Sequence, residues 1–138
     1  MEKYILSHDM GTGSDKAVLV DYDGTIKATA VEPYPTFYPN PAWVEQNPDD
    51  YWQAVAKSSR AIVEKTGICP SQIKGVVFST QAQGIIPVDK DGNVLYNNIT
   101  WVDGRAEKQA QNIMKRLGGR KLFSMAAGTP IMGKDCIA

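Results

Sequence analysis

Residues 5–26 read ILSHDMGTGSDKAVLVDYDGTI, and the spacing of their turn residues indicates the fold class. Residues 3–9 and the continuous apolar run at 17–21 are strand candidates, separated by Gly-Thr-Gly-Ser, four residues that favour a tight turn. A third strand candidate, with alternating apolar residues at 25–31, follows Asp23-Gly24, a pair that is common in hairpin turns. The pattern predicts three consecutive strands that pair as an antiparallel meander.

A long helix and a further strand are expected after a proline-rich, extended segment at residues 33–48. Asn47 is a typical N-cap, Pro48 suits the first helical turn, and Gly67 suits the helix end. The apolar face expected on this helix consists of Trp52, Val55, Ile62 and Val63. The run IKGVVFS at residues 73–79 predicts a strand parallel to an earlier one, because a helix crossover connects them.

The remaining residues predict a hairpin and two shorter helices. Apolar runs at residues 85–88 and 94–96 flank a turn at residues 89–93. Helices are expected at residues 104–117 and 121–127, with no recognisable element after Gly128. The apolar face expected on the first of them consists of Ala106, Ala110, Ile113, Met114 and Leu117. The fold class is therefore α/β, with a meander, a crossover helix, a parallel strand and C-terminal helices.

Composition and charge narrow the classes of function. Hydrophobic residues make up 43% of the 138 residues, enough to form the core of one domain. Basic and acidic side chains number 15 each, and a net charge of zero disfavours nucleic-acid binding. No apolar run approaches the ~20 residues of a membrane span. The two cysteines, Cys69 and Cys136, are far apart in the sequence, which favours a reducing cytoplasm over a disulfide framework.

The segment DMGTGSDK at residues 9–16, called the glycine turn below, carries the clearest chemical signal. Its glycines let backbone N–H groups approach an anion, and Thr12 and Ser14 add hydroxyl donors. Lys16 supplies a positive charge, and Asp9 suits Mg²⁺, which reaches phosphates through one or two carboxylates and water. The pattern predicts a magnesium–phosphate cradle, with an ordinary polar hairpin as the alternative.

Four segments in order resemble the FGGY carbohydrate kinases, and the nearest branch is the xylulokinase-like one. Residues 5–26 resemble the first meander of the superfamily that also contains actin and heat-shock chaperones. PAWVEQNPDDYWQAV at residues 41–55 is similar to the family signature PGWxEQDPxxWW. GVVFSTQAQGIIPVDKDGNVL at residues 75–95 and NITWVDGRAEKQ at residues 98–109 resemble its two following motifs. The resemblance implies a ribonuclease-H-like fold and ATP-dependent phosphorylation of a hydroxyl group on a pentulose or a related sugar or polyol.

The resemblance also implies roles for individual residues. Asp9 would lie beside Mg²⁺ and the transferred phosphate. The residues expected along the ATP phosphates are Gly11, Thr12, Gly13, Ser14 and Lys16. Those expected on the side of the sugar are Gln81, Ala82, Gln83, Trp101, Asp103 and Arg105. Ala82 and Gln83 stand where xylulokinases often carry Met and His, so the sequence leaves the identity of the sugar open.

Several of these residues have an ordinary structural interpretation as well. Asp103 could cap the helix expected near residue 104, and Arg105 could pair with a nearby carboxylate. Trp101 could be part of a core, and Gln81 could be a simple loop residue. His8, the only histidine, is expected to be a strand residue with an internal hydrogen bond.

The length of the chain suggests the opening portion of a longer kinase, residues 1–138 being part of its first lobe. In the family, the catalytic base and the adenosine site lie in later regions. We therefore expect the chain alone to be inactive, since phosphoryl transfer depends on complete positioning around the γ-phosphate. The open strand edge of a partial sheet predicts one of three outcomes, which are a homodimer, marginal stability, or cover by the missing half.

Two alternatives belong to other classes. VLVDYDGTI at residues 18–26 fits the first motif of haloacid-dehalogenase phosphatases, with Asp21 as nucleophile and Asp23 as acid or base. The hairpin interpretation explains the same residues by turn chemistry alone. The other alternative is a non-catalytic fragment that binds a sugar or a partner protein.

Overall fold

The computed structural model describes residues 2–130, 132 and 133, and it divides the chain into two compact units. Unit 1 comprises Met1–Pro35 and Asn47–Gln81, and unit 2 comprises Thr36–Gln46 and Ala82–Ala138. Each unit is described by itself below. Among the described residues, no helix is long and apolar enough to cross a membrane.

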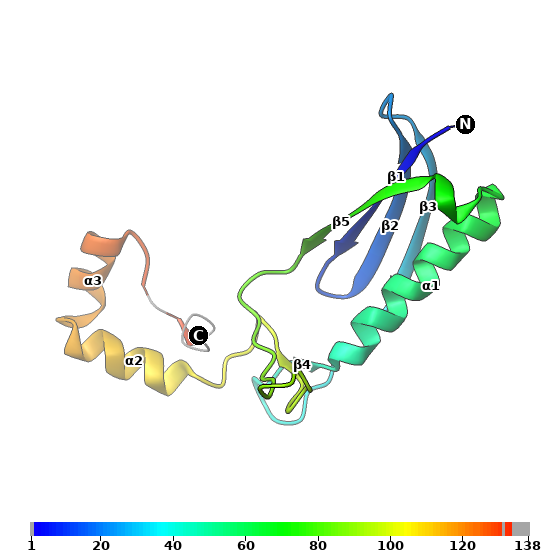
Figure 1. Cartoon of the computed structure of the whole chain (residues 1–138). Helices are drawn as coiled ribbons and strands as arrows, with labels where there is room; N and C mark the ends of the chain where they lie inside the picture. The colour runs from blue at the N-terminus through cyan, green and yellow to red at the C-terminus, as the bar shows by residue number, and fades with distance from the viewer. Residues whose placement is uncertain (1, 131, 134–138) are drawn as a thin grey trace. The chain divides into compact units, whose positions relative to one another are not determined.

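Unit 1 is a four-stranded sheet with one long helix on one face (Figure 1). Its strands are β1 (Tyr4–Met10), β2 (Ser14–Asp21), β3 (Ile26–Pro33) and β5 (Ile73–Thr80), in the order β3-β2-β1-β5. The first three pair antiparallel and β5 pairs parallel to β1. The predicted meander, crossover helix and parallel strand are confirmed.

Helix α1 (Pro48–Thr66) begins and ends where the sequence predicts. The Asn47 side chain accepts a hydrogen bond from the Asp49 N–H, and Gly67 ends the helix in the left-handed conformation. The predicted buried face is wrong at one position, because Trp52 is 69% exposed. The buried residues of the helix are Tyr51, Ala54, Val55, Ser58 and Ile62.

A polar network explains why a serine lies in the buried face of α1. Ser58 Oγ donates to Asp15 Oδ2 at 2.6 Å, and His8 Nδ1 lies 2.9 Å from the same oxygen. His8 Nε2 lies 3.2 Å from Ser59 Oγ, and the ring of His8 stacks on Phe78. The expected internal hydrogen bond of His8 is therefore present. The apolar core beside this network consists of Tyr4, Leu6, Ala17, Leu19, Ala28 and Ile62.

Unit 2 contains short strands and two helices. β4 (Glu45–Gln46) pairs antiparallel with β6 (Asn98–Ile99), so the proline-rich segment is not wholly irregular. The predicted hairpin at residues 85–96 is reduced to isolated bridges, Val88 with Val94 and Ile85 with Ile99. A short 3-10 turn (Pro70–Gln72) belongs to unit 1 and precedes β5.

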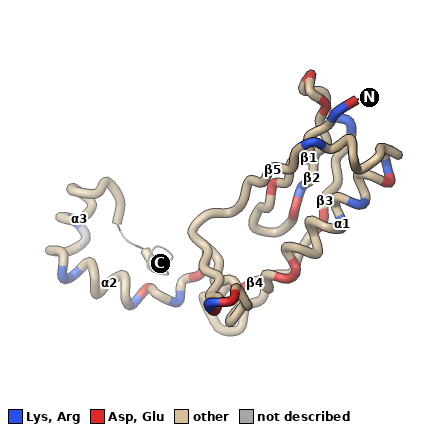
Figure 2. The backbone as a smooth tube through the Cα atoms, in the orientation of Figure 1, with Lys and Arg blue, Asp and Glu red and all other residues tan. Residues whose placement is uncertain are grey.

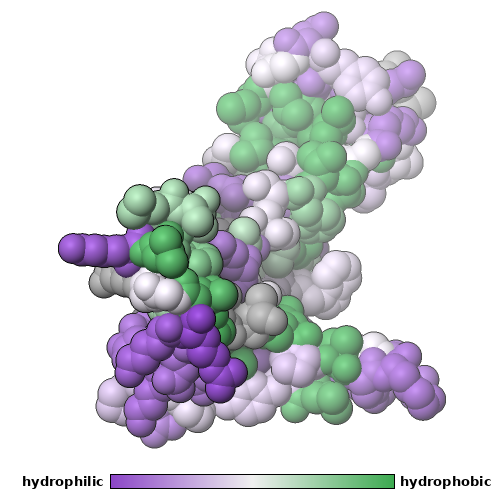
Figure 3. Space-filling model, turned by 90° about the vertical axis from the view of Figure 1, so that its left-hand side faces the viewer, coloured by the Kyte–Doolittle hydropathy of each residue, from purple (hydrophilic) through white to green (hydrophobic). Residues whose placement is uncertain are grey.

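Helices α2 (Glu107–Arg116) and α3 (Gly119–Ala127) correspond to the two predicted C-terminal helices. α2 begins three residues later than expected, because residues 103–105 form a hydrogen-bonded loop described below. Its buried side chains include Ala110 and Met114, whereas Ile113 and Leu117 are exposed. Apolar side chains accordingly show at the surface of these helices (Figure 3). Much of the segment after Gly128, including Cys136, lies outside the described residues.

Candidate functional site

The glycine turn joins β1 to β2 at one end of the sheet in unit 1 (Figure 1). Asp9 and Lys16 stand directly opposite each other in the β1–β2 register. Both are exposed, and alternation along the strands places them on the face opposite α1, which covers His8 and Asp15. A carboxylate and an ammonium group therefore stand side by side next to the turn, in a unit where charges of both signs are spread over the elements (Figure 2).

The backbone of the turn is open on one side at Gly13, whereas Gly11 closes the turn. The N–H of Gly11 donates to the carbonyl of Ser14 at 3.0 Å, which closes the turn. Neither Gly11 nor Gly13 has a positive φ, so backbone conformation is not what requires glycine here. A Cβ built on Gly13 would meet no protein atom within 4 Å. The space beside Gly13 is open, which suits close approach of an external anion to the backbone.

Gln81 is held next to the glycine turn within unit 1. Its N–H donates to the carbonyl of Met10 at 2.9 Å, which continues the β1–β5 pairing beyond Met10 and Thr80. Its Nε2 donates to the hydroxyl of Tyr51 at 3.2 Å. The structure thus brings Gln81 to the same end of the sheet as Asp9.

The other residues expected on the side of the sugar lie in unit 2. Ala82 and Gln83 are exposed, and Gln83 has a positive φ of 63°, a conformation that non-glycine residues adopt infrequently. Trp101 is half-buried in the loop before α2. Asp103 is fully buried, and Arg105 is mostly buried.

Asp103 and Arg105 form an internal ion pair. Arg105 donates to both carboxylate oxygens of Asp103, from Nε and Nη2, each at 2.9 Å. Asp103 also accepts from the backbone N–H groups of Arg105 at 2.9 Å and Val44 at 2.6 Å. The guanidinium lies 4.0 Å from the ring centroid of Trp43. The expected structural alternative for Arg105, pairing with a nearby carboxylate, is therefore observed.

Glu45 completes this cluster and was not identified from the sequence. Its carboxylate is almost fully buried and accepts from Arg105 Nη2 at 2.7 Å. It also accepts from the Tyr96 hydroxyl at 2.7 Å and from Asn97 Nδ2 at 3.1 Å. The only sequence feature that pointed to Glu45 is that it directly follows two apolar residues, Trp43 and Val44. Together, Glu45, Asp103 and Arg105 tie the proline-rich segment to the loop that carries Trp101.

The hydrogen bonds keep this cluster charged. Burial alone would raise the pKa of Glu45, but donation from Arg105, Tyr96 and Asn97 outweighs it and lowers the pKa below the usual value. The pKa of Asp103 is lowered in the same way, with burial opposed by Arg105 and the Val44 N–H. The pKa of Arg105 is raised, chiefly by its hydrogen bonds to Asp103.

Comparison with known proteins gives the family. The model of the FGGY family of carbohydrate kinases, N-terminal domain, matches residues 4–134. The chain belongs to the FGGY family of carbohydrate kinases. A curated glycerol kinase from Thermococcus gammatolerans is 35% identical over 118 residues, which cover 86% of this chain and 24% of that protein.

Solved FGGY structures share the fold. The gluconate kinase from Lactobacillus acidophilus is 27% identical with a TM-score of 0.81, covering 97% of this chain and 26% of that one. The ligand-bound xylulose kinase from the same species is 28% identical with a TM-score of 0.78, covering 88% and 24%. The sequence therefore spans about a quarter of the length of the FGGY kinases that it matches.

The phosphatase alternative does not agree with the structure or the family. Asp21 lies at the end of β2, and its Oδ1 accepts from the N–H groups of Asp23 at 3.0 Å and Thr25 at 2.8 Å. Its Oδ2 pairs with Lys27 Nζ at 2.8 Å. The carboxylate expected to be the phosphatase nucleophile is thus engaged in closing the β2–β3 hairpin.

Asp9 could supply one ligand to Mg²⁺, and the others would have to come from phosphate and water. Among the described residues, no group of three or more His, Cys, Asp or Glu side chains could hold a metal ion. A single exposed carboxylate beside an open turn nevertheless suits Mg²⁺, which commonly binds one or two carboxylates and completes its octahedron with phosphate oxygens and water. The residues present therefore fit a metal that arrives with a phosphorylated ligand.

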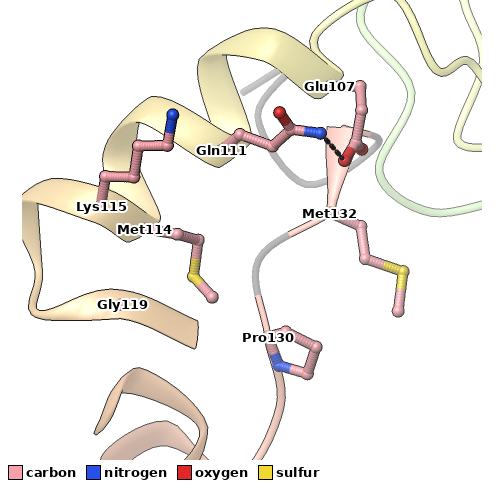
Figure 4. A pocket seen from close by; sticks show the side chains of 7 residues that line it. All are labelled: Glu107, Gln111, Met114, Lys115, Gly119, Pro130 and Met132. Atoms are coloured by element: carbon pink, nitrogen blue, oxygen red, sulfur yellow. Dashed lines mark hydrogen bonds between the residues drawn. The ribbon is translucent and has the colours of Figure 1, made fainter. Parts of the chain in front are cut away.

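A separate cavity of about 510 Å³ in unit 2 lies between α2 and the segment that follows α3 (Figure 4). Glu107 and Gln111 stand at one end, where Gln111 Nε2 donates to Glu107 Oε1 at 3.1 Å. Met114 and Pro130 provide apolar walls. None of the residues predicted to bind substrate or phosphate lines this cavity, so it adds nothing to the kinase site.

Proposed function

We propose that this chain supplies the phosphate-handling opening portion of an ATP- and Mg²⁺-dependent kinase that transfers the γ-phosphoryl group to a hydroxyl of a pentulose or a related sugar or polyol. One observation carries the proposal. Exposed Asp9 and Lys16 face each other beside a turn whose backbone at Gly13 is open. The arrangement matches what a phosphate cradle requires, in a chain of the FGGY family.

The residues of the glycine turn would have different roles in binding Mg²⁺ and phosphate. Asp9 would hold Mg²⁺, which neutralises charge on the phosphates when it is bound. Lys16 would add positive charge from the neighbouring strand, and Gly11 and Gly13 would let the chain approach closely. The hydroxyl groups of Thr12 and Ser14 would donate to phosphate oxygens.

The substrate side is assigned by residue chemistry. Gln81, Ala82, Gln83 and Trp101 would contact the sugar, with the two glutamines as donors and acceptors for hydroxyl groups. Asp103 and Arg105 direct their polar atoms at each other and at Glu45. We therefore place Asp103 and Arg105 behind the residues that would contact the sugar, where their ion pair fixes the conformation of the loop that carries Trp101. The names of the relatives include glycerol, gluconate and xylulose kinases. We therefore propose a class of substrate, small polyhydroxylated molecules, and no single compound.

The catalytic base and the adenosine pocket would come from later regions of the whole kinase. A carboxylate there would take the proton of the attacking hydroxyl. We expect the chain alone not to catalyse transfer, and we place the whole kinase in the cytoplasm because the cysteine usage favours a reducing compartment.

The test is a binding and turnover measurement on the 138-residue chain. Titration with MgATP should shift the amide resonances of residues 9–16, and titration with xylulose, gluconate and glycerol should identify which compound shifts residues 81–83 and 101. Asp9→Asn should abolish the first effect, whereas Asp23→Asn, which alters an exposed turn carboxylate, should not. MgATP shifts that avoid the glycine turn would contradict the proposal, and sugar-dependent ADP release by the chain alone would contradict the expected inactivity.

A further inference from the structure

Tyr34 makes two hydrogen bonds to the glycine turn. It follows the last residue of β3 and is 6% exposed. Its hydroxyl donates to the carbonyl of Gly11, and its backbone N–H donates to the carbonyl of Gly13 at 3.2 Å. A single residue therefore fixes the carbonyl groups of both glycines.

This anchoring sets the direction of the neighbouring amide. In a trans peptide the carbonyl of one residue and the N–H of the next point in opposite directions. Because the Gly11 carbonyl is held on Tyr34, the Thr12 N–H is directed away from Tyr34. Tyr34 lies on the α1 side of the sheet, packed with Tyr51, so the Thr12 N–H is directed away from that side.

Tyr34 is itself held in a fixed position. Its ring meets that of Tyr51 edge to face, with centroids 4.9 Å apart and planes at 75°. Tyr51 in turn accepts the hydrogen bond from Gln81. Burial, followed by the nearby Tyr51, Asp15 and Asp9, raises the pKa of Tyr34 to about 12. The hydroxyl therefore keeps its proton, and can donate, throughout the neutral range.

We propose that Tyr34 is a positioning residue for the glycine turn, which it holds in the shape that receives the phosphates of the bound nucleotide. This inference rests on the proposed function, and it assigns to Tyr34 the pre-organisation of that same site. A turn that is already shaped loses less conformational freedom when an anion binds. Tyr34 need not touch the ligand for this effect.

The experiment measures binding of Mg²⁺–tripolyphosphate to the 138-residue chain by amide chemical shifts, well below the melting temperature. Tyr34→Phe keeps the ring and removes the hydroxyl, and it should weaken binding about five- to tenfold, because a turn that is no longer anchored loses more backbone freedom when the anion binds. The Thr12 amide resonance of the unliganded variant should also move. Two control variants should bind like the unmodified chain: Tyr51→Phe, which removes a hydroxyl from the same cluster, and Tyr38→Phe, which alters a side chain that is 72% exposed.

The outcomes separate the two claims. If the unmodified chain does not bind tripolyphosphate, the proposed function fails and this inference fails with it. If it binds and Tyr34→Phe binds equally well, only the role of Tyr34 is refuted. Equal weakening in Tyr34→Phe and Tyr51→Phe would refute it too, because loosening of the cluster would then be the cause. If Tyr34→Phe does not fold, amide hydrogen exchange of the unliganded, unmodified chain tests the proposal instead. The Gly11–Thr12 peptide should be rigid before ligand is added, and a mobile peptide there would refute the role of Tyr34.

Discussion

Replacing Arg105 with methionine should destabilise unit 2 strongly. The change removes the cation between two buried carboxylates, Glu45 at 2% and Asp103 at 0% exposure. Three side-chain hydrogen bonds and the contact with Trp43 are lost with it. Removing one partner from a buried ion pair costs about 3–5 kcal/mol, because it leaves an uncompensated charge.

The exposure of Arg105 narrows the expected loss of unfolding free energy. The Arg105 side chain is 18% exposed, so some water screens the pair and the lower end of the range, about 3 kcal/mol, is expected. With a urea dependence of about 1.5 kcal/mol per molar, the midpoint should fall by about 2 M. Such a loss is a large part of the stability of an ordinary domain, about 5–15 kcal/mol.

The assay is urea unfolding followed by the amide resonances of unit 2. Arg116→Met is the matched control, because Arg116 is an exposed residue of α2, and it should change stability by less than about 0.5 kcal/mol. Adding Glu45→Gln to Arg105→Met should recover part of the loss, since one stranded charge is then neutral. A loss below about 1 kcal/mol in Arg105→Met, or no recovery in the double variant, would show that the two buried carboxylates do not depend on Arg105.

Three further predictions follow from the same structure. Gly13→Ala should leave stability unchanged or raise it by about 0.4–1 kcal/mol, as its φ is not positive and its Cβ meets no neighbour. It should nevertheless weaken tripolyphosphate binding at least about tenfold, whereas Gly75→Ala, equally open but in β5, should not; equal binding by both variants would count against an anion at the turn. Because the folded-state pKa values of Glu45 and Asp103 are lowered, their stabilisation is present above an unfolded pKa of about 4 and is lost as the pH falls through the folded values. The urea midpoint should therefore drop on acidification below about pH 4, and less so in Glu45→Gln; an identical drop in both proteins would contradict this. Finally, β5 is an edge strand with Val76, Val77 and Phe78 exposed, so light scattering should detect a dimer that Val77→Lys disrupts, and a monomer at every concentration would contradict this prediction.

The sequence predicted the elements whose signals are local. α1 begins at its Asn-Pro signal and ends at Gly67, because capping depends on a few adjacent residues. The β1–β2–β3 meander follows from two turns and three apolar runs. The burial of Ser58 in place of Trp52 could not be predicted in this way, since it depends on Asp15, a residue 43 positions away.

In the candidate site, too, contacts within one segment were predictable from the sequence, and contacts between distant residues were not. Asp9, Gly13 and Lys16 lie in one short segment, so their proximity was predictable. The pairing of Glu45 with Arg105 joins residues 60 positions apart and depends on the β4–β6 pairing of two-residue strands, which no periodicity indicates. Tyr34 was overlooked because a tyrosine among prolines has no chemical signature until its hydroxyl is seen on the Gly11 carbonyl.

The most direct test of the phosphate site replaces Mg²⁺ with Mn²⁺, which also prefers oxygen ligands and broadens nearby amide resonances. With tripolyphosphate and Mn²⁺ both present, we expect selective broadening at residues 9–16 that disappears in Asp9→Asn. Little broadening is expected with Mn²⁺ alone, because one carboxylate holds the ion weakly. Broadening centred instead on the acidic turns at Asp21 or Asp89, or unchanged in Asp9→Asn, would contradict the assignment of the glycine turn as the magnesium–phosphate site.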